Sequence, residues 1–416
     1  MTDQTLDKTT LIVGAGHAGV QAAASLREYG WQGQIVLIND EDRLPYERPP
    51  LSKTFDGEKA IVPLRPQAFF DDKRIDLKMG SAVASINADG QSLELSDGTT
   101  LTYDNCIVCT GSGPLRVPPF DDPNMDGVYV LRNAPDEAAM RTAIDAGDLR
   151  RLLVIGAGFI GLETAAALAE RLHAITVVDL APSAMGRGIA PEIGQLCVDA
   201  LQKTGVEVHF ETKVESIATT DDGLKITLTG GKTLTVDGVL LSVGARPNDD
   251  LLVNAGLGEH RAIAVDTNCQ VPGTKGLYAV GDMVMAPHPL LGDQPVRLES
   301  VDVAVLQAKT AAAAICGAAE PRVQAPWFWS TQGKNKMQMV GIKGMATQWV
   351  IRHDHTADVP TATALGFNDD NQLMAAQCLN NPKDFAASRK FWGTAPAMDI
   401  QALADASLSL KEAFSA

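Results

Sequence analysis

The sequence predicts an α/β protein in which one strand–turn–helix–strand unit occurs twice. Gly-x-Gly-x-x-Gly turns begin at Gly14 and Gly156, 142 positions apart, and each lies between an apolar strand and a helix. The chain of 416 residues is also long for a single hydrophobic core. We therefore expect two or three domains, two of them Rossmann-like dinucleotide-binding domains.

The first unit has every part of a dinucleotide-binding fingerprint. Residues 10–13 form an apolar strand, residues 20–29 a helix and residues 34–38 a second strand. Glycines let the backbone approach a pyrophosphate at the helix N-terminus, and an acid after the second strand holds the ribose hydroxyls. That acid is Asp40, 21 positions after the last turn glycine. The residues of this turn are Gly14, Gly16, His17, Ala18 and Gly19.

The second unit repeats these parts. Residues 151–155 form the strand, an alanine-rich helix runs to residue 172, and residues 174–178 form the next strand. Asp179 lies 18 positions after the last turn glycine. Two coincidental turns with this full context are improbable, so we assign one fingerprint to a permanently bound FAD and the other to an exchangeable NADH. The second turn contains Gly156, Gly158, Phe159, Ile160 and Gly161.

Composition restricts the class of protein. An apolar fraction of 45% with 21% charged residues is typical of a soluble globular protein. No signal peptide is recognisable, and the most apolar stretch, residues 152–169, is interrupted by glycines and Glu163, so we expect a cytoplasmic protein without a membrane span. The net charge of −16 argues against nucleic-acid binding.

Cysteine usage favours a reducing compartment. Six cysteines are scattered along the chain, and Cys106 and Cys109 form a CxxC. They lie in a β-rich run, where residues three apart point to opposite faces, so we expect two buried thiols rather than a redox or metal centre.

The rest of the chain reads as further strands. Alternating stretches at 92–95, 224–228 and 232–236 end in glycine turns and predict β-hairpins. From Pro326 onward tryptophans occur in strand-like context, and the tail from Asp399 reads as a final helix.

Several motifs resemble those of one family, the FAD-dependent pyridine-nucleotide oxidoreductases, and within it the ferredoxin reductases of Rieske oxygenases and bacterial cytochromes P450. The resemblance covers nearly the whole chain, and its PPLSK and FWS elements are the specific ones. The matching segments are the two glycine turns, LPYERPPLSK at 44–53, Thr110-Gly111, GARPN at 244–248, LYAVGD at 277–282, RLESV at 297–301 and PWFWS at 326–330.

The resemblance implies a glutathione-reductase-like arrangement. A discontinuous FAD domain would comprise residues 1–115 and 246–323, an NAD domain residues 116–245, and a C-terminal α+β domain residues 324–416. Besides the first turn and Asp40, the resemblance implies FAD contacts from Arg48, Lys53, Val83, Thr110, Gly111, Arg132, Gly281, Asp282, Ser300, Val301 and Trp329. Besides the second turn and Asp179, it implies NAD contacts from Arg187 and Gly244.

The resemblance also names a short set of catalytic candidates. Relatives that use a disulfide place two cysteines soon after the first acid, whereas this chain has no cysteine before Cys106. Lys53 would lie near the reactive edge of the flavin and pair with Glu163, and Trp329 would lie beside the ring on the route to an acceptor. Each residue taken alone is also compatible with a surface charge or a core aromatic. His17 is expected to be a turn residue rather than a base.

Nucleotide choice depends on Asp179, whose carboxylate accepts ribose hydroxyls and repels a 2′-phosphate. Many relatives have an arginine four residues later, where this chain has Ser183. NADH is therefore favoured, although Asp179 is shorter than the glutamate common in the family, which leaves room for some use of NADPH.

The expected partner is a [2Fe-2S] ferredoxin that serves an oxygenase. Two segments depart from the family pattern, TQGKNK at 331–336 and DVA at 302–304. Lys334 and Lys336 would give an acidic ferredoxin a local basic patch, and a solvated loop explains them equally well. The alternatives are a rubredoxin reductase, an NADH oxidase, or an interaction flavoprotein like apoptosis-inducing factor. Either a monomer or a homodimer fits the sequence.

Overall fold

The computed structural model describes residues 6–288, 290–291, 295–354 and 359–415. By its internal contacts the chain divides into two compact units, each assembled from separate segments. Unit 1 contains Met1–Arg48, Ile61–Gly113 and Ala245–Gln324, and unit 2 contains Pro49–Ala60, Pro114–Gly244 and Ala325–Ala416. The three-domain boundaries expected from the sequence stay a prediction.

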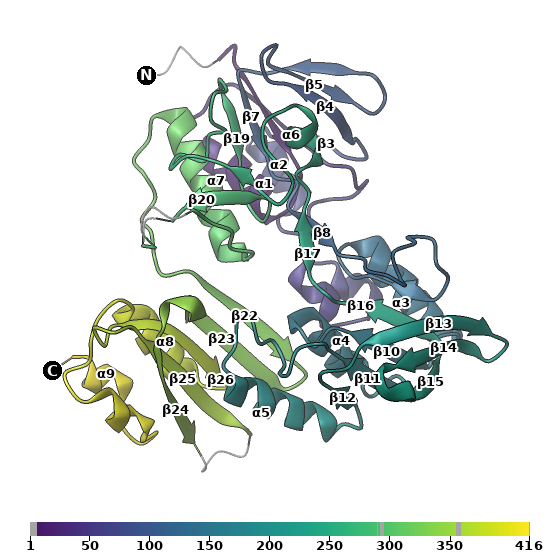
Figure 1. The fold of residues 1–416 in the computed structure, drawn as a ribbon. Coiled ribbons are helices and arrows are strands. Elements are labelled where there is room, and N and C mark those ends of the chain that lie inside the picture. Colours follow the sequence, from purple (N-terminus) through teal and green to yellow (C-terminus); the bar gives the residue numbers. More distant parts are fainter. Residues whose placement is uncertain (1–5, 289, 292–294, 355–358, 416) are drawn as a thin grey trace. The chain divides into compact units, whose positions relative to one another are not determined.

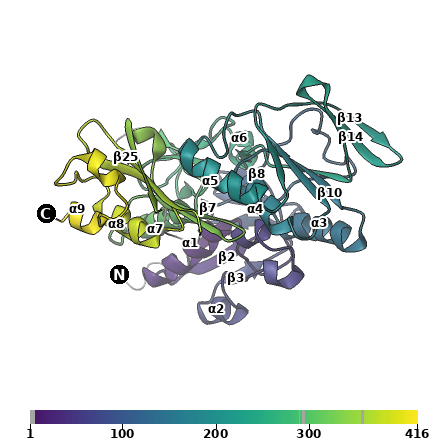
Figure 2. The same cartoon turned by 90° about the horizontal axis from the view of Figure 1, so that it is seen from below.

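Unit 1 is built on a five-stranded parallel sheet with the strand order β19-β7-β1-β2-β3. Helices α1 and α7 pack together beside it (Figures 1 and 2). The inner strands are almost wholly apolar and buried, as expected when helices cover a parallel sheet. The elements are β1 (Thr9–Val13), α1 (His17–Glu28), β2 (Gln34–Ile38), β3 (Asp76–Lys78), β7 (Asn105–Val108), β19 (Leu277–Ala279) and α7 (Val301–Cys316).

Smaller elements complete unit 1. An antiparallel sheet of β4, β5 and β6 contains the hairpin predicted at 92–95. The elements are α2 (Gln67–Asp72), β4 (Val83–Asn87), β5 (Ser92–Leu95), β6 (Thr100–Thr102), α6 (Asp250–Asn254), β18 (Ile263–Ala264), β20 (Val284–Pro287) and β21 (Pro295–Val296). Two further strands, β8 (Ser112–Pro114) and β17 (Ala245–Pro247), pair where the chain passes between units.

Unit 2 contains a second five-stranded sheet with the order β12-β11-β10-β16-β9. A three-stranded antiparallel sheet of β13, β14 and β15 confirms the predicted hairpin strands. The elements are 3-10 helices η1 (Pro49–Ser52), η2 (Gly57–Ala60) and η3 (Thr229–Gly231), strands β9 (Val128–Tyr129), β10 (Arg151–Ile155), β11 (Ala174–Val178), β12 (Glu207–His209), β13 (Val214–Thr220), β14 (Gly223–Leu228), β15 (Thr233–Val236) and β16 (Gly238–Leu241), and helices α3 (Ala134–Ala146), α4 (Phe159–Leu168) and α5 (Pro191–Gln202).

The end of the chain adds an antiparallel sheet to unit 2, with the order β22-β23-β26-β25-β24. One hydrophobic cluster joins residues of this sheet to α4, α5 and β10, so the two sheets share a core. The elements are β22 (Trp327–Gln332), β23 (Asn335–Gly341), η4 (Lys343–Met345), β24 (Gln348–Asp354), β25 (Thr361–Phe367), β26 (Leu373–Leu379), α8 (Pro382–Phe391), η5 (Ile400–Ala404) and α9 (Leu410–Ala413).

Three predicted helices differ from the structure. The first, predicted at 20–29, begins at His17 and ends at Glu28. The tail from Asp399 is not one helix, because Asp405 accepts bonds from the amide and hydroxyl of Ser407 and so turns the chain between η5 and α9. The alanine-rich helix α4 ends at Leu168, four residues earlier than predicted, since the amides of Arg171 and Leu172 both bond to the Leu168 carbonyl in a closing turn. Within the described residues, no helix is long and apolar enough to cross a membrane.

The CxxC segment agrees with the sequence interpretation. Cys106 lies on β7 and Cys109 just after it, and both are buried free thiols. Burial raises the pKa of both groups.

Candidate functional site

The glycine turn after β1 forms an open cradle. Gly14 has a φ of 102°, and a Cβ there would lie 2.5 Å from the Cys109 carbonyl oxygen. A Cβ on Gly19 would lie 1.9 Å from the Gly14 carbonyl oxygen, so α1 packs this close only with glycine. Around Gly16, by contrast, no atom lies within 4 Å of a Cβ position. The space over the start of α1 therefore fits a pyrophosphate.

The turn after β10 has the same construction. A Cβ on Gly156 would lie 2.3 Å from the Ser242 carbonyl oxygen, and one on Gly161 would lie 2.1 Å from the Gly156 carbonyl oxygen. At Gly158 the nearest atom to a Cβ would be 3.9 Å away. Each turn thus has two glycines fixed by packing and a middle glycine that faces open space.

The residues that follow the second strands differ between the two cradles. Asp179 follows β11 directly, and its carboxylate accepts the Ala157 amide at 2.6 Å and the Ala181 amide at 2.8 Å. The equivalent position after β2 is Asn39, whose side chain accepts the Ala15 amide at 3.2 Å. Asp40 comes one residue later and is exposed. Sequence spacing missed Asn39 because it searched only for an acid.

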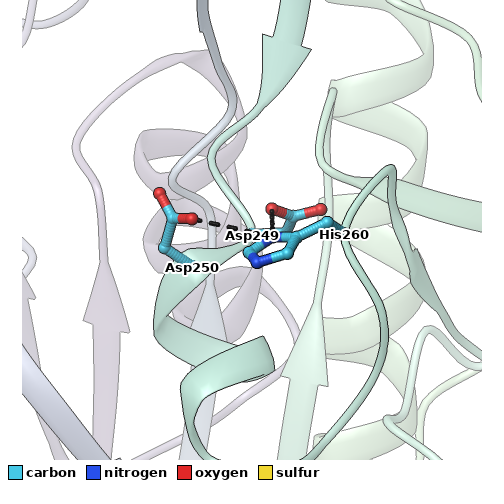
Figure 3. A group of neighbouring side chains, drawn as sticks. All are labelled: Asp249, Asp250 and His260. Atoms are coloured by element: carbon cyan, nitrogen blue, oxygen red, sulfur yellow. Dashed lines mark hydrogen bonds and ion pairs between the residues drawn. The ribbon is translucent and has the colours of Figure 1, made fainter.

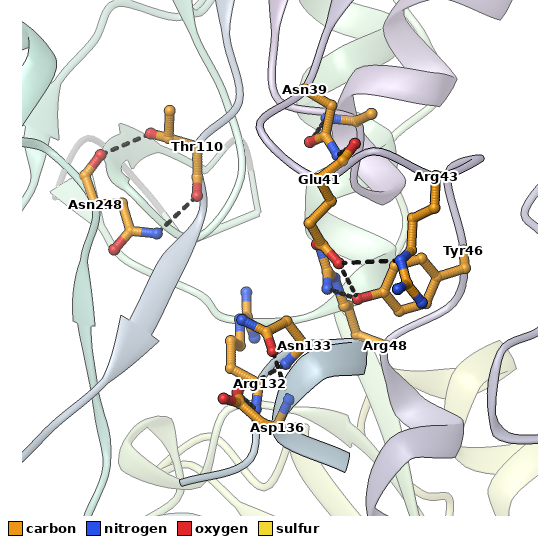
Figure 4. Close-up of polar contacts among 11 residues, drawn as sticks. Asn39, Glu41, Arg43, Tyr46, Arg48, Thr110, Arg132, Asn133, Asp136 and Asn248 are labelled. Carbon is orange, nitrogen blue, oxygen red and sulfur yellow. Dashed lines mark hydrogen bonds and ion pairs between the residues drawn. The ribbon is translucent and has the colours of Figure 1, made fainter. Parts of the chain in front are cut away.

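Several predicted FAD residues of unit 1 are hydrogen bonded beside the first cradle (Figure 4). The Thr110 hydroxyl donates to the Asn248 carbonyl at 2.6 Å, and the Asn248 amide donates back to the Thr110 carbonyl at 2.9 Å. Ser112 donates to Asp282 at 2.9 Å, and the Gly281 amide donates to Gln307 at 2.7 Å. These bonds hold the ends of β7 and β19, which are neighbours in the sheet, in a fixed arrangement.

Arg48 lies in a compact polar group of unit 1 (Figure 4). Its guanidinium is 2.6 Å from the Glu41 carboxylate and 4.4 Å above the Tyr46 ring. The Tyr46 hydroxyl also donates to Glu41 at 2.8 Å. Sequence reasoning named Arg48 and missed Glu41 and Tyr46, although both lie within or next to the LPYERPPLSK segment.

Four further FAD candidates lie at or near the starts of elements. Ser300 caps α7 by accepting the Val303 amide at 3.2 Å, and Val301 is the first residue of that helix. Val83 begins β4 in unit 1. Arg132 belongs to unit 2, where its amide donates to Asp136 at 2.8 Å just before α3.

A single buried carboxylate, that of Glu163, connects three segments of unit 2. Glu163 lies in α4 and is 3% exposed. Lys53 donates to it at 2.8 Å, and the Ser52 hydroxyl bonds to the same oxygen. Its other oxygen accepts the Ser330 hydroxyl at 2.7 Å and the Thr331 amide at 3.3 Å. The structure therefore brings Lys53 and Glu163 together and adds two serines that the sequence did not indicate.

Trp329 lies on β22 next to Ser330. Its ring packs on Trp327 with centroids 5.4 Å apart and planes 31° apart. Phe328 makes an edge contact of 4.8 Å with Phe159, which begins α4 beside the second cradle. The Glu163 bonds and this ring contact attach the tryptophan strand to the nucleotide-binding part of unit 2.

Arg187 lies close to Gly244, which follows β16. Gly244 has a φ of 120°, and the Arg187 guanidinium would lie 3.5 Å from a Cβ at that position. Lys334 and Lys336 are exposed at the turn between β22 and β23. The structure thus places Arg187 next to Gly244 and the two lysines at the β22–β23 hairpin.

A separate polar group in unit 1 has a structural explanation (Figure 3). The buried Asp249 accepts the Arg261 amide at 2.9 Å and lies 3.3 Å from the His260 ring nitrogen, which is 3.7 Å from Asp250. These contacts tie the start of α6 to the turn at 260–261, and the side chains of His260 and Asp250 are 63% and 50% exposed. We assign no ligand to this group.

Two parallel sheets with paired glycine cradles define the class of protein, a flavoprotein with two dinucleotide-binding domains. The pyridine nucleotide-disulphide oxidoreductase model matches residues 8–308, and the reductase C-terminal model matches residues 327–414. The chain belongs to this pyridine nucleotide-disulphide oxidoreductase family, whose members use FAD and a pyridine nucleotide.

Relatives and solved structures agree with this assignment. The chain is 35% identical over 407 residues to rhodocoxin reductase of Rhodococcus erythropolis, covering 96% of this chain and 93% of that protein. It is also 35% identical to the ferredoxin–NAD(+) reductase component of the anthranilate 1,2-dioxygenase system of Burkholderia cepacia, covering 96% and 98%. The structure matches putidaredoxin reductase in its covalent complex with putidaredoxin, with a TM-score of 0.89, 30% identity and 98% of both chains covered. It matches the ferredoxin reductase for the CYP199A2 system of Rhodopseudomonas palustris with a TM-score of 0.89, 34% identity and coverage of 98% and 100%.

Proposed function

We propose that this chain is an NADH-dependent ferredoxin reductase with FAD in the first cradle and NADH in the second. The observation that carries the proposal is the pair of open glycine turns, at Gly16 and Gly158, in a chain whose relatives include ferredoxin–NAD(+) reductase components. Bound FAD would supply the step from a two-electron donor to a one-electron acceptor. The sequence has no cysteine before Cys106, which argues against a disulfide as an intermediate carrier.

The residues of the chain would bind and orient both groups. The first cradle would hold the FAD pyrophosphate on the amides that begin α1, and the Thr110–Asn248 bonds would keep its wall rigid. In the second cradle, amides at the start of α4 would hold the NADH pyrophosphate. Asp179 is already fixed by two backbone amides, which keeps its carboxylate preorganised for a ribose hydroxyl.

Glu163 would keep the Lys53 ammonium in place beside the flavin. Lys53 also donates to the Pro49 carbonyl at 2.8 Å, so two acceptors define the direction of its side chain. Because Ser330 donates to the same carboxylate, Glu163 would also fix the strand that contains Trp329. One buried charge thereby sets the positions of a cation and an aromatic ring, which supports Trp329 as part of the route to the acceptor.

The proposal also covers the choice of nucleotide and of electron acceptor. NADH is favoured over NADPH by Asp179 and by Ser183, where relatives have an arginine. A small [2Fe-2S] protein is the proposed acceptor, since such proteins are acidic and take one electron at a time. Exposed Lys334 and Lys336 lie at the end of the β22–β23 hairpin that contains Trp329.

Anaerobic reduction tests the proposal. The purified protein should show flavin absorbance, NADH should bleach it, and a [2Fe-2S] ferredoxin should restore it with one-electron stoichiometry. NADPH should act with a lower kcat/KM. Absence of flavin from the purified protein would overturn the proposal, and so would bleached flavin that only oxygen restores.

A further inference from the structure

The loop that ends at α5 is held by side chains from the C-terminal sheet of unit 2. Lys343, in η4, donates to the Gly186 and Ile189 carbonyls at 2.7 Å each. Gln377, on β26, accepts the Ala190 amide at 2.6 Å and donates to the Gly188 carbonyl at 2.9 Å. Residues 185–190, named here the Arg187 loop, thus receive four hydrogen bonds from two side chains that follow them by more than 150 positions.

These two side chains have no other polar contact in the part of the chain that the structure describes. Gln377 is 2% exposed and uses both ends of its amide on the loop. Lys343 is half-buried, and the bonds that its ammonium donates go to two backbone carbonyls of the loop. Because the Gln377 amide and the Lys343 ammonium bond only to backbone groups of the Arg187 loop, they fix the position of that loop.

The Arg187 loop is bonded to the second cradle at one point and lies close to its surroundings at two others. The Met185 amide donates to the Ala157 carbonyl at 2.9 Å, within the fingerprint turn itself. A Cβ on Gly188 would lie 3.8 Å from the Phe159 ring, at the first turn of α4. The exposed Arg187 reaches to Gly244. A shift of this loop would therefore move a guanidinium relative to the site of the nucleotide phosphates.

The strand order identifies which part of the nucleotide Arg187 would meet. In the order β11-β10-β16, Asp179 follows β11, Gly156 follows β10 and Gly244 follows β16. The ribose 2′ position belongs beside the acid after β11. Arg187 lies next to Gly244, on the β16 side, so its guanidinium would meet the pyrophosphate over the glycine turn rather than a 2′ substituent.

We propose that Lys343 and Gln377 are positioning residues for the pyridine nucleotide, which hold the Arg187 loop so that the Arg187 guanidinium meets the pyrophosphate. The inference rests on the proposed NADH site in the second cradle. In this proposal the C-terminal sheet, which also contains Trp329, supports the nucleotide site through the Arg187 loop. The sheet itself does not contact the nucleotide. Because NADH and NADPH share the pyrophosphate, the loop acts equally on both.

The test uses the FAD-loaded enzyme with ferricyanide as acceptor, so that ferredoxin docking does not enter. Lys343→Met and Gln377→Leu keep the side-chain volume and remove the bonds. Each should raise KM for NADH and for NADPH by the same factor, about tenfold, with kcat changed less than about twofold. The Kd of NAD+ measured by calorimetry should rise by the same factor. Lys343→Arg, which keeps a charged donor, should restore most of the affinity.

Two comparisons separate positioning from general packing. In an Arg187→Ala background, Lys343→Met should add little further loss, because both changes remove the same contact. Lys383→Met, at an exposed position of α8 in the same unit, should leave KM unchanged.

Three results would overturn the inference. They are an unchanged KM in both positioning variants, an effect on NADPH alone, and a parallel fall of kcat and FAD content. Failure of the proposed function would look different, since wild-type protein would then not be reduced by NADH at all.

Discussion

Replacement of Glu163 by glutamine should destabilise unit 2 although the two side chains have the same shape. The carboxylate accepts bonds from Ser52, Lys53, Ser330 and the Thr331 amide. A glutamine has one acceptor oxygen, which would serve Lys53 and Ser52. Its amide nitrogen would then face the Ser330 hydroxyl and the Thr331 N–H. Because an amide nitrogen donates and does not accept, the Thr331 N–H would lose its hydrogen-bond acceptor.

The magnitude follows from burial. Glu163 is 3% exposed and the Lys53 side chain 21%, so the ion pair lies between the surface and fully buried cases. We expect a loss of about 2–3 kcal/mol in the free energy of unfolding, or a fall in melting temperature of about 4–10 °C. The assay is urea unfolding of the FAD-loaded protein with thermal melting as a second measure. NADH-driven ferricyanide reduction should fall about tenfold, since Lys53 is no longer held.

Glu137→Gln is the matched control. Glu137 is 2% exposed in α3 of the same unit, and it forms an ion pair with Arg141 at 3.3 Å. Burial raises the pKa of Glu137 even though Arg141 opposes this, so removal of its charge should cost less than about 1 kcal/mol. Equal losses in the two variants would refute the role given to the Glu163 bonds.

Three further changes test other parts of the structure. Burial raises the pKa of Asp237, but bonds from Arg151 outweigh it and hold that pKa below its ordinary value. Asp237→Asn should therefore lower stability at pH 7, and urea titrations should show the difference vanish as pH falls below about 4. The thiols of Cys106 and Cys109 should resist a thiol reagent until the protein unfolds, and rapid labelling of the native protein would contradict their burial. Trp329→Leu should slow ferredoxin reduction about tenfold while NADH-driven bleaching stays near wild type in stopped-flow traces, whereas a selective loss of bleaching would contradict the acceptor route.

Local patterns made the two cradles predictable. Each depends on glycines within six positions and on an apolar strand and a helix next to them. A short stretch of sequence is therefore enough to predict each cradle. The pairing of Lys53 with Glu163 followed from a resemblance to relatives. Asn39 was missed because the search required an acid at this position. Its neutral side chain accepts the backbone N–H of Ala15 in the same way that the Asp179 carboxylate accepts that of Ala157.

Long-range contacts explain what the sequence did not predict. Ser330 is 167 positions from Glu163, and Gln377 is 187 positions from Ala190, so only the folded sheets bring them together. The tail was misread because the alanines and leucines after Asp399 favour a helix, whereas the local bonds of Asp405 with Ser407 favour a turn. Hydrogen bonds from side chains to the backbone decide between helix and turn here, and the spacing of apolar residues does not reveal these bonds.

The assignment of the two cradles is tested most directly by a pair of matched valine variants. Gly16 and Gly158 both have extended backbone, with φ of −77° and −80°, and a Cβ would meet no atom within 4 Å at Gly16 and only the Ser242 carbonyl oxygen, at 3.9 Å, at Gly158. Gly16→Val should purify without flavin absorbance. Gly158→Val should retain FAD that dithionite bleaches and NADH does not. Loss of flavin from Gly158→Val, or FAD retained and bleached by NADH in Gly16→Val, would contradict the account.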